Sequence, residues 1–249
     1  MTLKYDIENR TALVTGANRG IGKAIVEAFL EKGASKVYVG VRTLSTAKPL
    51  LDKYGDRVEV IQIDLAKPET ITAASAKATD VEIVVNNAGV LKNSTPLDEN
   101  AIEILNYEME MNVYGLIRMA KAFAPVLKEN GGGAFIQLNS IASMKNFLPF
   151  STYSASKAAA YSITQGLKDI LSEQGTQVIS VHPGPIATDM GDDAGLTEIA
   201  EPPSLVADAL VNALKSGEFH VFPDSMAIQI QGQYQSYAAN IIEANLMES

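Results

Sequence analysis

Hydrophobic residues recur along this chain in two alternating patterns, short apolar runs and longer segments whose apolar residues are three or four apart. The first run, residues 11–15, stops at a glycine, and helical spacing then continues from about Ile21 to Gly33. The alternation predicts strands at residues 11–15, 36–41, 58–63, 82–85, 134–138, 177–181 and 218–222, separated by helices near 45–54, after 68, at about 98–129, around 153–157 and at about 204–215.

Strands that alternate with helices in this way predict the α/β class. We expect a doubly wound, seven-stranded parallel sheet with helices on both faces, that is, a Rossmann fold. The length of 249 residues and the lack of a linker or internal repeat predict a single domain over residues 1–249. Ligands of such sheets bind beyond the carboxyl ends of the strands, so the residues that follow the strands are the functional candidates.

The composition narrows the class of protein. Hydrophobic residues make up 47% and charged residues 20%, the balance of a soluble globular chain. The absence of cysteine excludes disulfides and thiolate metal sites, and it fits a reducing, cytoplasmic location. The charged N-terminus and the lack of a long apolar run predict neither export nor a membrane span. The net charge of −9 argues against a nucleic-acid partner. His182 and His220 lack metal-ligand spacing, so we expect structural roles and no metal.

A glycine-rich turn follows the first strand. Because glycine permits a tight turn and close backbone approach, the free N–H groups of the next helix could hold a pyrophosphate. The spacing is G-x-x-x-G-x-G rather than the commoner G-x-G-x-x-G. The alternative is that the glycines only let the helix pack on the strand. The turn contains Gly16, Asn18, Arg19, Gly20, Ile21 and Gly22.

The end of the second strand bears on cofactor choice. An acidic residue there would bind the adenosine ribose of NAD, but no carboxylate lies between Glu31 and Asp52. Arg42 stands at this position instead and, with Arg19 of the turn, is suited to a 2′-phosphate. The sequence therefore favours NADP(H), unless both arginines are only solvated surface charges.

Tyr153 and Lys157 lie four residues apart in a predicted helix and share one face. A free tyrosine has a pKa of about 10, so it transfers protons slowly near neutral pH. A neighbouring lysine charge would stabilise the phenolate and bring this pKa closer to working pH. A chance pairing is the alternative, so the interpretation depends on the rest of the chain.

Several further motifs occur in a fixed order. Asp64-Leu65 follows the third strand, Asn86-Asn87-Ala88-Gly89 the fourth, and Pro183-Gly184-Pro185-Ile186-Ala187-Thr188 the sixth, with Asn112 and Ser140 between them. Together with the glycine turn and the Tyr153–Lys157 pair, this order resembles the short-chain dehydrogenase/reductase family, in its compact single-domain branch.

The resemblance implies a set of cofactor contacts. Asp64 and Leu65 would flank the adenine, and Lys157 would hold the nicotinamide ribose. A capping role for Asp64 and a simple turn at 86–89 are the alternatives. The other implied cofactor residues are Asn87, Ala88 and Gly89 at the ribose and Pro183, Gly184, Ile186 and Thr188 at the nicotinamide end.

The resemblance also implies catalytic roles. Tyr153 would donate the proton, Ser140 would orient the substrate oxygen, and Asn112 would hold a water that links Lys157 to solvent. Ser140 lies thirteen residues before Tyr153, the usual interval, with Ser143 as the alternative. The implied activity is NADPH-dependent reduction of a small-molecule ketone or aldehyde. The alternatives are a non-catalytic NADP(H) sensor and an epimerase or dehydratase, for which the chain after Thr188 is short.

The last quarter of the chain departs from the family pattern. Residues 189–203 form the expected substrate lid, a loop with few apolar residues, so we expect modest or promiscuous substrates, with 147–150 supplying contacts. Residues 226–249 are predicted to form a helical extension that covers its own domain or a subunit contact. We expect a homo-oligomer, a dimer or tetramer, through the helices at 98–129 and 151–172. The apolar face of the extension comprises Ile230, Tyr234, Tyr237, Ala238, Ile241 and Ile242, up to about Leu246.

Overall fold

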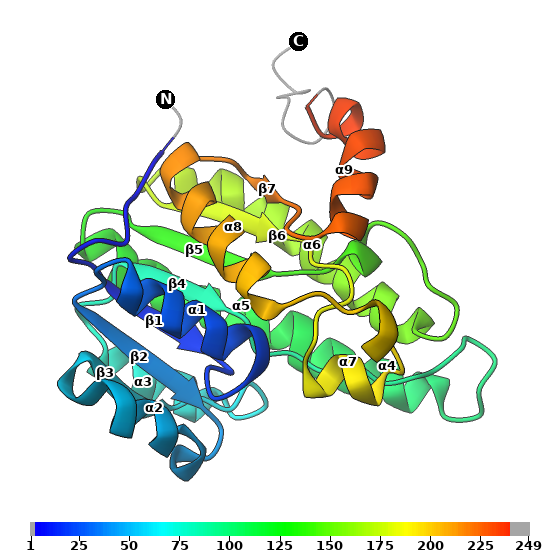
Figure 1. The fold of residues 1–249 in the computed structure, drawn as a ribbon, viewed down its shortest axis with the longest axis horizontal. Helices are drawn as coiled ribbons and strands as arrows, with labels where there is room; N and C mark the ends of the chain where they lie inside the picture. Colours follow the sequence, from blue (N-terminus) through cyan, green and yellow to red (C-terminus); the bar gives the residue numbers. More distant parts are fainter. Residues whose placement is uncertain (1–2, 240–249) are drawn as a thin grey trace.

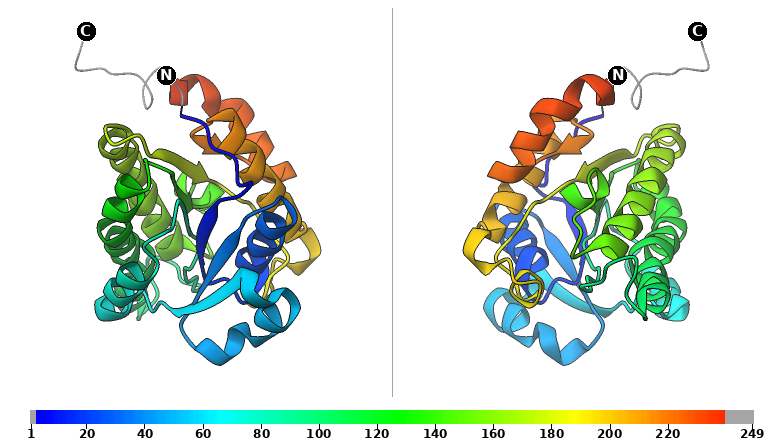
Figure 2. Two further views of the ribbon diagram at one scale, coloured as in Figure 1. Left: turned by 90° about the vertical axis from the view of Figure 1, so that its left-hand side faces the viewer. Right: turned by 90° about the vertical axis from the view of Figure 1, so that its right-hand side faces the viewer.

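The computed structural model describes residues 3–239 as one parallel β-sheet between two layers of helices (Figures 1 and 2). The strand order β3-β2-β1-β4-β5-β6-β7 reverses direction between β1 and β4, which confirms the predicted doubly wound fold. The last strand has only two residues instead of the five expected. The strands are β1 Thr11–Thr15, β2 Lys36–Val41, β3 Val58–Gln62, β4 Ile83–Asn86, β5 Ala134–Leu138, β6 Gln177–Val181 and β7 His220–Val221.

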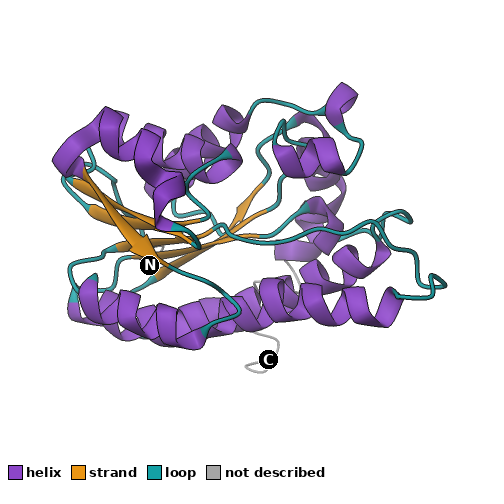
Figure 3. Cartoon of the chain, turned by 90° about the horizontal axis from the view of Figure 1, so that it is seen from below, coloured by secondary structure: helices purple, strands orange, loops and turns teal. Residues whose placement is uncertain are grey.

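The helices cover both faces of the sheet, which Figure 3 shows between the two layers. One layer contains α1 Gly20–Glu31, α2 Lys48–Tyr54 and α8 Pro203–Ser216, and the other contains α3 Pro68–Lys77, α4 Ala101–Met109, α5 Gly115–Glu129 and α6 Ser151–Ser172. The remaining helices are α7 Asp189–Asp193 and α9 Ser225–Tyr237, with 3₁₀ turns at Leu44–Ala47, Gly55–Arg57, Ile141–Ser143 and Thr197–Ile199.

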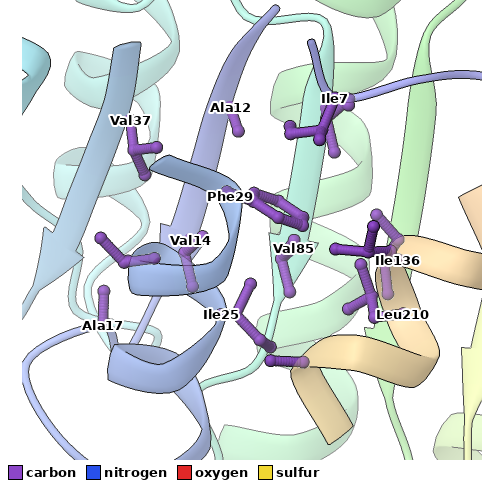
Figure 4. Packing of buried hydrophobic residues seen from close by; sticks show 14 of the residues in the cluster. Ile7, Ala12, Val14, Ala17, Ile25, Phe29, Val37, Val85, Ile136 and Leu210 are labelled. Carbon is purple, nitrogen blue, oxygen red and sulfur yellow. The ribbon is translucent and has the colours of Figure 1, made fainter. Parts of the chain in front are cut away.

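Successive strand residues point into two different cores. On one side, Phe29 and Ile25 of α1 and Leu210 of α8 pack against Val14 and the neighbouring strands (Figure 4). On the other side, Leu13 belongs to a second core with residues of α5 and α6. Because both faces are buried, the strands read as almost continuous apolar runs rather than as alternating ones. This packing fixes the carboxyl ends of the strands, where the candidate residues lie.

Two segments differ from the prediction. The helical stretch at 98–129 begins at Ala101 and runs to Glu129 without a break, because a π-helical segment, Glu110–Tyr114, joins α4 to α5. The expected loop at 189–203 contains α7, whose first turn is capped by Thr188: its hydroxyl accepts a hydrogen bond from Gly191 N at 3.2 Å.

The C-terminal extension is helical as predicted over α9, which ends at Tyr237. The hydroxyl of Tyr234 lies 3.0 Å from that of Tyr161 on α6, so α9 contacts its own domain. Ile241, Ile242 and Leu246 lie outside the described residues.

Candidate active site

A cleft of about 570 Å³ lies where the carboxyl ends of the strands meet. It brings together most of the residues that the sequence singled out, from six separate segments of the chain. Those predicted residues are Gly16, Asn18, Arg19, Gly20, Ile21, Arg42, Asp64, Leu65, Asn87, Ala88, Gly89, Tyr153, Lys157, Pro183 and Thr188.

The glycine turn after β1 has the conformation that its sequence suggests. Gly16 and Gly20 have φ angles of +62° and +52°, which disfavour other residues. A Cβ at Gly22 would lie 2.7 Å from Asn87 Nδ2 and closer still to the carbonyl oxygen of Gly16. Gly22 does not line the cleft itself, and its role is to let α1 approach the turn.

Two side chains hold this turn against the end of β4. Asn87 Nδ2 donates to the carbonyl oxygen of Thr15 at 2.8 Å. The Thr15 hydroxyl accepts hydrogen bonds from the amides of Asn87 and Ala88, both at 3.0 Å. Sequence reasoning missed Thr15. The available signal was a polar residue at the end of an apolar strand, directly before the glycines.

The amino end of α1 opens toward the cleft. Its N-cap, Arg19, makes no side-chain capping hydrogen bond, and the first turn carries no acidic residue. The free amides and the helix dipole therefore suit an anion such as a pyrophosphate.

The two candidate arginines lie on the same side of the cleft. Arg42 is exposed at the end of β2, and Arg19 forms an ion pair with Asp189 at 2.6 Å. Arg19 is thus paired, although its side chain is still largely exposed to solvent. Its partner is the first residue of α7, which the sequence did not reveal.

Asp64 and Leu65 line the cleft after β3, and each also has a local structural role. Asp64 Oδ1 accepts a hydrogen bond from Ala66 N at 3.1 Å, which is a turn contact; the N-cap of α3 is Lys67, so the alternative that Asp64 caps this helix is wrong. Leu65 is buried and packs closely against Gly115.

Gly184 and Ile186 lie behind the cleft rather than in its lining. The amide of Gly184 donates to Asp224 Oδ2 at 2.6 Å, and Ile186 is buried. Asp224 also caps α9, where it accepts from Ala227 N at 3.0 Å. The loop after β6 is therefore fixed to the start of α9.

Tyr153 and Lys157 lie on α6, and both side chains are almost fully buried. The Lys157 ammonium donates to the carbonyl oxygen of Leu138 at 2.8 Å and lies 5.7 Å from the centre of the Tyr153 ring. The helix thus directs both groups to the cleft beside the end of β5, as their spacing predicts.

The electrostatics of this pair differ from the prediction. Burial raises the pKa of Tyr153 to about 12; the Ser140 hydroxyl opposes this shift and the Glu108 carboxylate adds to it. Burial also lowers the pKa of Lys157 to about 8. The expectation that the lysine charge brings the tyrosine pKa toward working pH is wrong in this arrangement, because desolvation of the phenolate is the largest effect and outweighs the opposing hydrogen bond of Ser140.

The structure distinguishes between the two candidate serines. Ser140 does not line the cleft itself, but its hydroxyl lowers the pKa of Tyr153 and accepts a hydrogen bond from Ala142 N at 3.1 Å. Ser143 Oγ instead donates to the carbonyl oxygen of Ser140 at 2.5 Å and bonds His182 Nδ1 at 3.0 Å. His182 also bonds Ser180 Oγ at 2.7 Å, and burial lowers its pKa to about 3, so the ring is neutral. Ser143 and His182 form a buried polar network behind Ser140.

Asn112 occupies the π-helical segment between α4 and α5, a type of distortion often found at functional sites. Its Oδ1 accepts from Val90 N at 2.9 Å, and its Nδ2 donates to Val90 O at 3.0 Å and to Ser156 Oγ at 2.9 Å. A Cβ at Gly89 would lie 3.0 Å from Asn112 Oδ1 and 3.7 Å from Lys157 Nζ, so the two side chains are neighbours. The water-relay role of Asn112 stays a prediction.

Several lining residues were not predicted. Tyr107 and Met111 come from the α4 side of the cleft, and Met190 comes from α7. They add apolar surface to the cleft, and helical spacing alone did not identify them as part of a site.

Residues 3–239 contain no cluster of three or more His, Cys, Asp or Glu side chains that could bind a metal ion. Within the same range, no helix is both long enough and apolar enough to cross a bilayer.

Several curated proteins are similar to this chain in sequence. Among curated relatives, a 3-oxoacyl-[acyl-carrier-protein] reductase of Vibrio cholerae is 31% identical over 207 residues, 80% of this chain and 84% of that protein. An uncharacterized oxidoreductase of Staphylococcus saprophyticus is 30% identical over 219 residues, 84% of this chain and 93% of that protein.

Solved structures are similar over almost the whole length. A short chain dehydrogenase of Burkholderia cenocepacia in complex with NADP has a TM-score of 0.86 and 36% identity, covering 96% of this chain and 100% of that one. A short-chain dehydrogenase of Sphingobium yanoikuyae in complex with NADPH has a TM-score of 0.77 and 26% identity, covering 95% and 98%.

A family of proteins matches about three quarters of the chain. Residues 10–198 match the family described as short chain dehydrogenase, a range that contains the glycine turn, Tyr153, Lys157 and Thr188. The chain is an oxidoreductase of the short-chain dehydrogenase/reductase family.

Proposed function

We propose that this protein is an NADPH-dependent carbonyl reductase that also oxidises the corresponding secondary alcohol. The observation that carries the proposal is that one cleft is lined by Tyr153 and Lys157 and also by the glycine turn, with Ser140 directly after the lining residue Asn139. A proton donor and a dinucleotide cradle then face each other across one cavity.

The chain fits the cofactor on its own geometry. Gly16 and Gly20 line the cleft with positive φ angles that disfavour side chains, so backbone alone borders it there, and the uncapped amino end of α1 suits the pyrophosphate. Arg42 and Arg19 supply positive charge where the ribose 2′-phosphate would lie, which favours NADP(H) over NAD(H). Two similar structures support this preference, because the Burkholderia and Sphingobium proteins are in complex with NADP and NADPH.

Each of the three side chains has a separate role in the proposed reaction. When bound, the cofactor supplies the hydride that reduces the carbonyl carbon. Tyr153 donates its proton to the carbonyl oxygen, and its raised pKa keeps that proton in place until transfer. Ser140 orients the same oxygen by hydrogen bonding. Lys157, held by the carbonyl oxygen of Leu138, places a cation beside the phenolate that forms.

The substrate class is a small ketone, aldehyde or 3-oxoacyl compound. The Vibrio relative is named for the last of these. Met190 of α7 lines the cleft, and residues 189–203 act as the lid in this proposal. The lid is short, so large substrates would gain little contact from it.

The proposal is tested by following NADPH consumption with ketones, aldehydes, 3-oxoacyl thioesters, quinones and sugars. Turnover on at least one class, with a lower KM for NADPH than for NADH, is the expected result. No turnover with any of them, despite NADPH binding, would overturn the reductase and favour a cofactor-sensing protein.

We also propose a cytoplasmic homo-oligomer. Ile102 on α4 and Ile170 on α6 are 79% and 66% exposed, which leaves apolar surface on the helices expected to form the contact. Light scattering should give a mass of at least two chains, and a monomeric mass would contradict the proposal.

A further inference from the structure

Four polar side chains face one another between the α4 helix and the catalytic helix α6. Glu108 and Asn112 are four residues apart on one side, and Thr152 and Ser156 are four apart on the other. Thr152 and Ser156 directly precede Tyr153 and Lys157 along α6. Thr152 and Ser156 are therefore each one peptide bond from a catalytic residue, and the four side chains together are named the α4–α6 ladder.

The second rung of the ladder is complete. Asn112 Nδ2 donates to Ser156 Oγ at 2.9 Å, and both polar atoms of Asn112 also bond Val90. The Ser156 hydroxyl donates in turn to the carbonyl oxygen of Tyr153 at 2.8 Å. This rung links the backbone of α6 at Tyr153 to the loop that follows β4.

The first rung, Glu108 and Thr152, also consists of two polar side chains, but no hydrogen bond joins them. Glu108 is fully buried, and its Oε1 accepts a hydrogen bond from Lys92 N at 2.9 Å. Within the described part of the chain, Glu108 Oε2 and Thr152 Oγ1 both lack a hydrogen-bond partner. Glu108 and Thr152 each lie one helical turn before the bonded pair Asn112 and Ser156, so the two orphan atoms face each other between the helices. In agreement, the Thr152 hydroxyl lowers the pKa of Glu108, against the larger effect of burial.

A fully buried carboxyl group is costly to keep unless it has a function or complete pairing. Asn112 fixes the loop backbone at Val90, and Glu108 fixes it again at Lys92, two residues further on. The feature that Glu108 adds is a negative charge and an acceptor directed at the first turn of α6.

We propose that Glu108 is a positioning residue for Tyr153, acting through Thr152 and through the backbone of Lys92. The inference rests on the proposed reductase function. Closure of the Glu108–Thr152 contact would hold the first turn of α6 and the wall at 90–92 as one unit, and so fix the phenol relative to the substrate.

The charge of Glu108 also affects the ionisation of Tyr153. The charged and titratable groups around it are Lys92 on the loop after β4 and Tyr153 on α6, with Lys157 farther along α6 beside Asn112. The carboxylate raises the pKa of Tyr153, which favours the protonated donor. Removal of the charge should therefore make the phenol easier to ionise.

The test compares Glu108→Ala, Glu108→Gln, Thr152→Val and Thr152→Ser, with Glu103→Gln as a matched control on an exposed position of the same helix. We expect kcat to fall about 10- to 100-fold in Glu108→Ala and Thr152→Val, while the KM for NADPH changes less than about twofold. Thr152→Ser should recover most of kcat. Equal kcat in Glu108→Ala and Glu103→Gln would overturn the proposal, as would equal losses in Thr152→Val and Thr152→Ser.

Glu108→Gln separates charge from packing. Glutamine keeps an acceptor for Lys92 N–H, so kcat should be largely retained. In the pH profile of alcohol oxidation, which requires the ionised phenol, the midpoint assigned to Tyr153 should move to lower pH. An unchanged midpoint would contradict an effect on Tyr153.

A readout without turnover keeps this inference separate from the proposed function. A double-mutant cycle of Glu108→Gln and Thr152→Val in urea unfolding should give non-additive shifts of the midpoint, whereas Glu103→Gln with Thr152→Val should be additive. If no substrate is turned over but the first cycle is non-additive, the reductase fails and the Glu108–Thr152 link stands. Additive behaviour in the first cycle would overturn the link itself.

Discussion

The guanidinium of Arg19 donates to the carboxylate of Asp189 at 2.6 Å, an ion pair that joins the glycine turn to the first residue of α7. Directly beside it, a Cβ at Gly20 would lie 2.9 Å from Thr188 Cγ2. The lid segment therefore begins in contact with the phosphate-binding turn, and Arg19 has a competing anion when a cofactor phosphate approaches.

Asp189→Asn should strengthen NADPH binding. The substitution frees Arg19 for the cofactor phosphate, and because the side chains are 71% and 64% exposed the effect should be modest, roughly two- to fivefold in Kd. Binding titrations with NADPH and NADH measure it, and NADH should change less. Asp193→Asn, an exposed position in the same short helix, is the control. Equal effects of the two variants would argue against the competition.

Gly22→Ala should damage the cofactor cradle, whereas Gly166→Ala should not. A methyl group at Gly22 collides with the turn backbone and Asn87, while the position of Gly166 on α6 has open space. We expect Gly166→Ala to stabilise the fold by about 0.5–1 kcal/mol, since alanine is the better helix former. Gly22→Ala should weaken NADPH and NADH binding alike. Wild-type affinity in Gly22→Ala would contradict the assigned turn.

The rate of carbonyl reduction should fall as the pH rises through about 8. Burial lowers the pKa of Lys157 to about 8, so its stabilising charge is present below that pH and lost above it. Tyr153, with a pKa of about 12, keeps its proton over this range. The pH profile of kcat measures the effect. In Lys157→Arg, whose charge persists, the inflection near 8 should disappear; its persistence would assign it to another group.

His182 should make the protein less stable in acid. Burial lowers the pKa of His182 from its ordinary value of 6.5 to about 3 in the folded chain, so the unfolded chain binds more protons between these pH values. The stability that neutral His182 provides is complete above about pH 6.5 and is lost as the pH falls toward 3. Urea unfolding at pH 7 and about pH 4.5 measures the difference, which should shrink in His182→Gln. An unchanged difference would locate the acid sensitivity elsewhere.

Much of this fold was predictable from local patterns. Each strand is a short apolar run because both faces of the sheet are buried, and the turns that follow carry the motif residues. The glycine turn and the Tyr153–Lys157 pair were readable because their geometry depends on residues close in sequence.

The parts that were missed depend on contacts between distant segments. The bond from Arg19 to Asp189 and the approach of Glu108 to Thr152 join residues that no local pattern pairs. The sequence also predicted a lowered pKa for Tyr153, whereas its pKa is raised. The burial that raises it depends on packing from several elements, which no local pattern shows.

The central claim is that Tyr153 is the proton donor in NADPH-dependent carbonyl reduction. The most direct measurement compares the wild-type protein with Tyr153→Phe for both NADPH binding and turnover of the best substrate. Because phenylalanine keeps the ring and removes only the hydroxyl, we expect Kd for NADPH to stay within about twofold and kcat to fall by about 10²–10⁴. Full turnover in Tyr153→Phe would contradict the account.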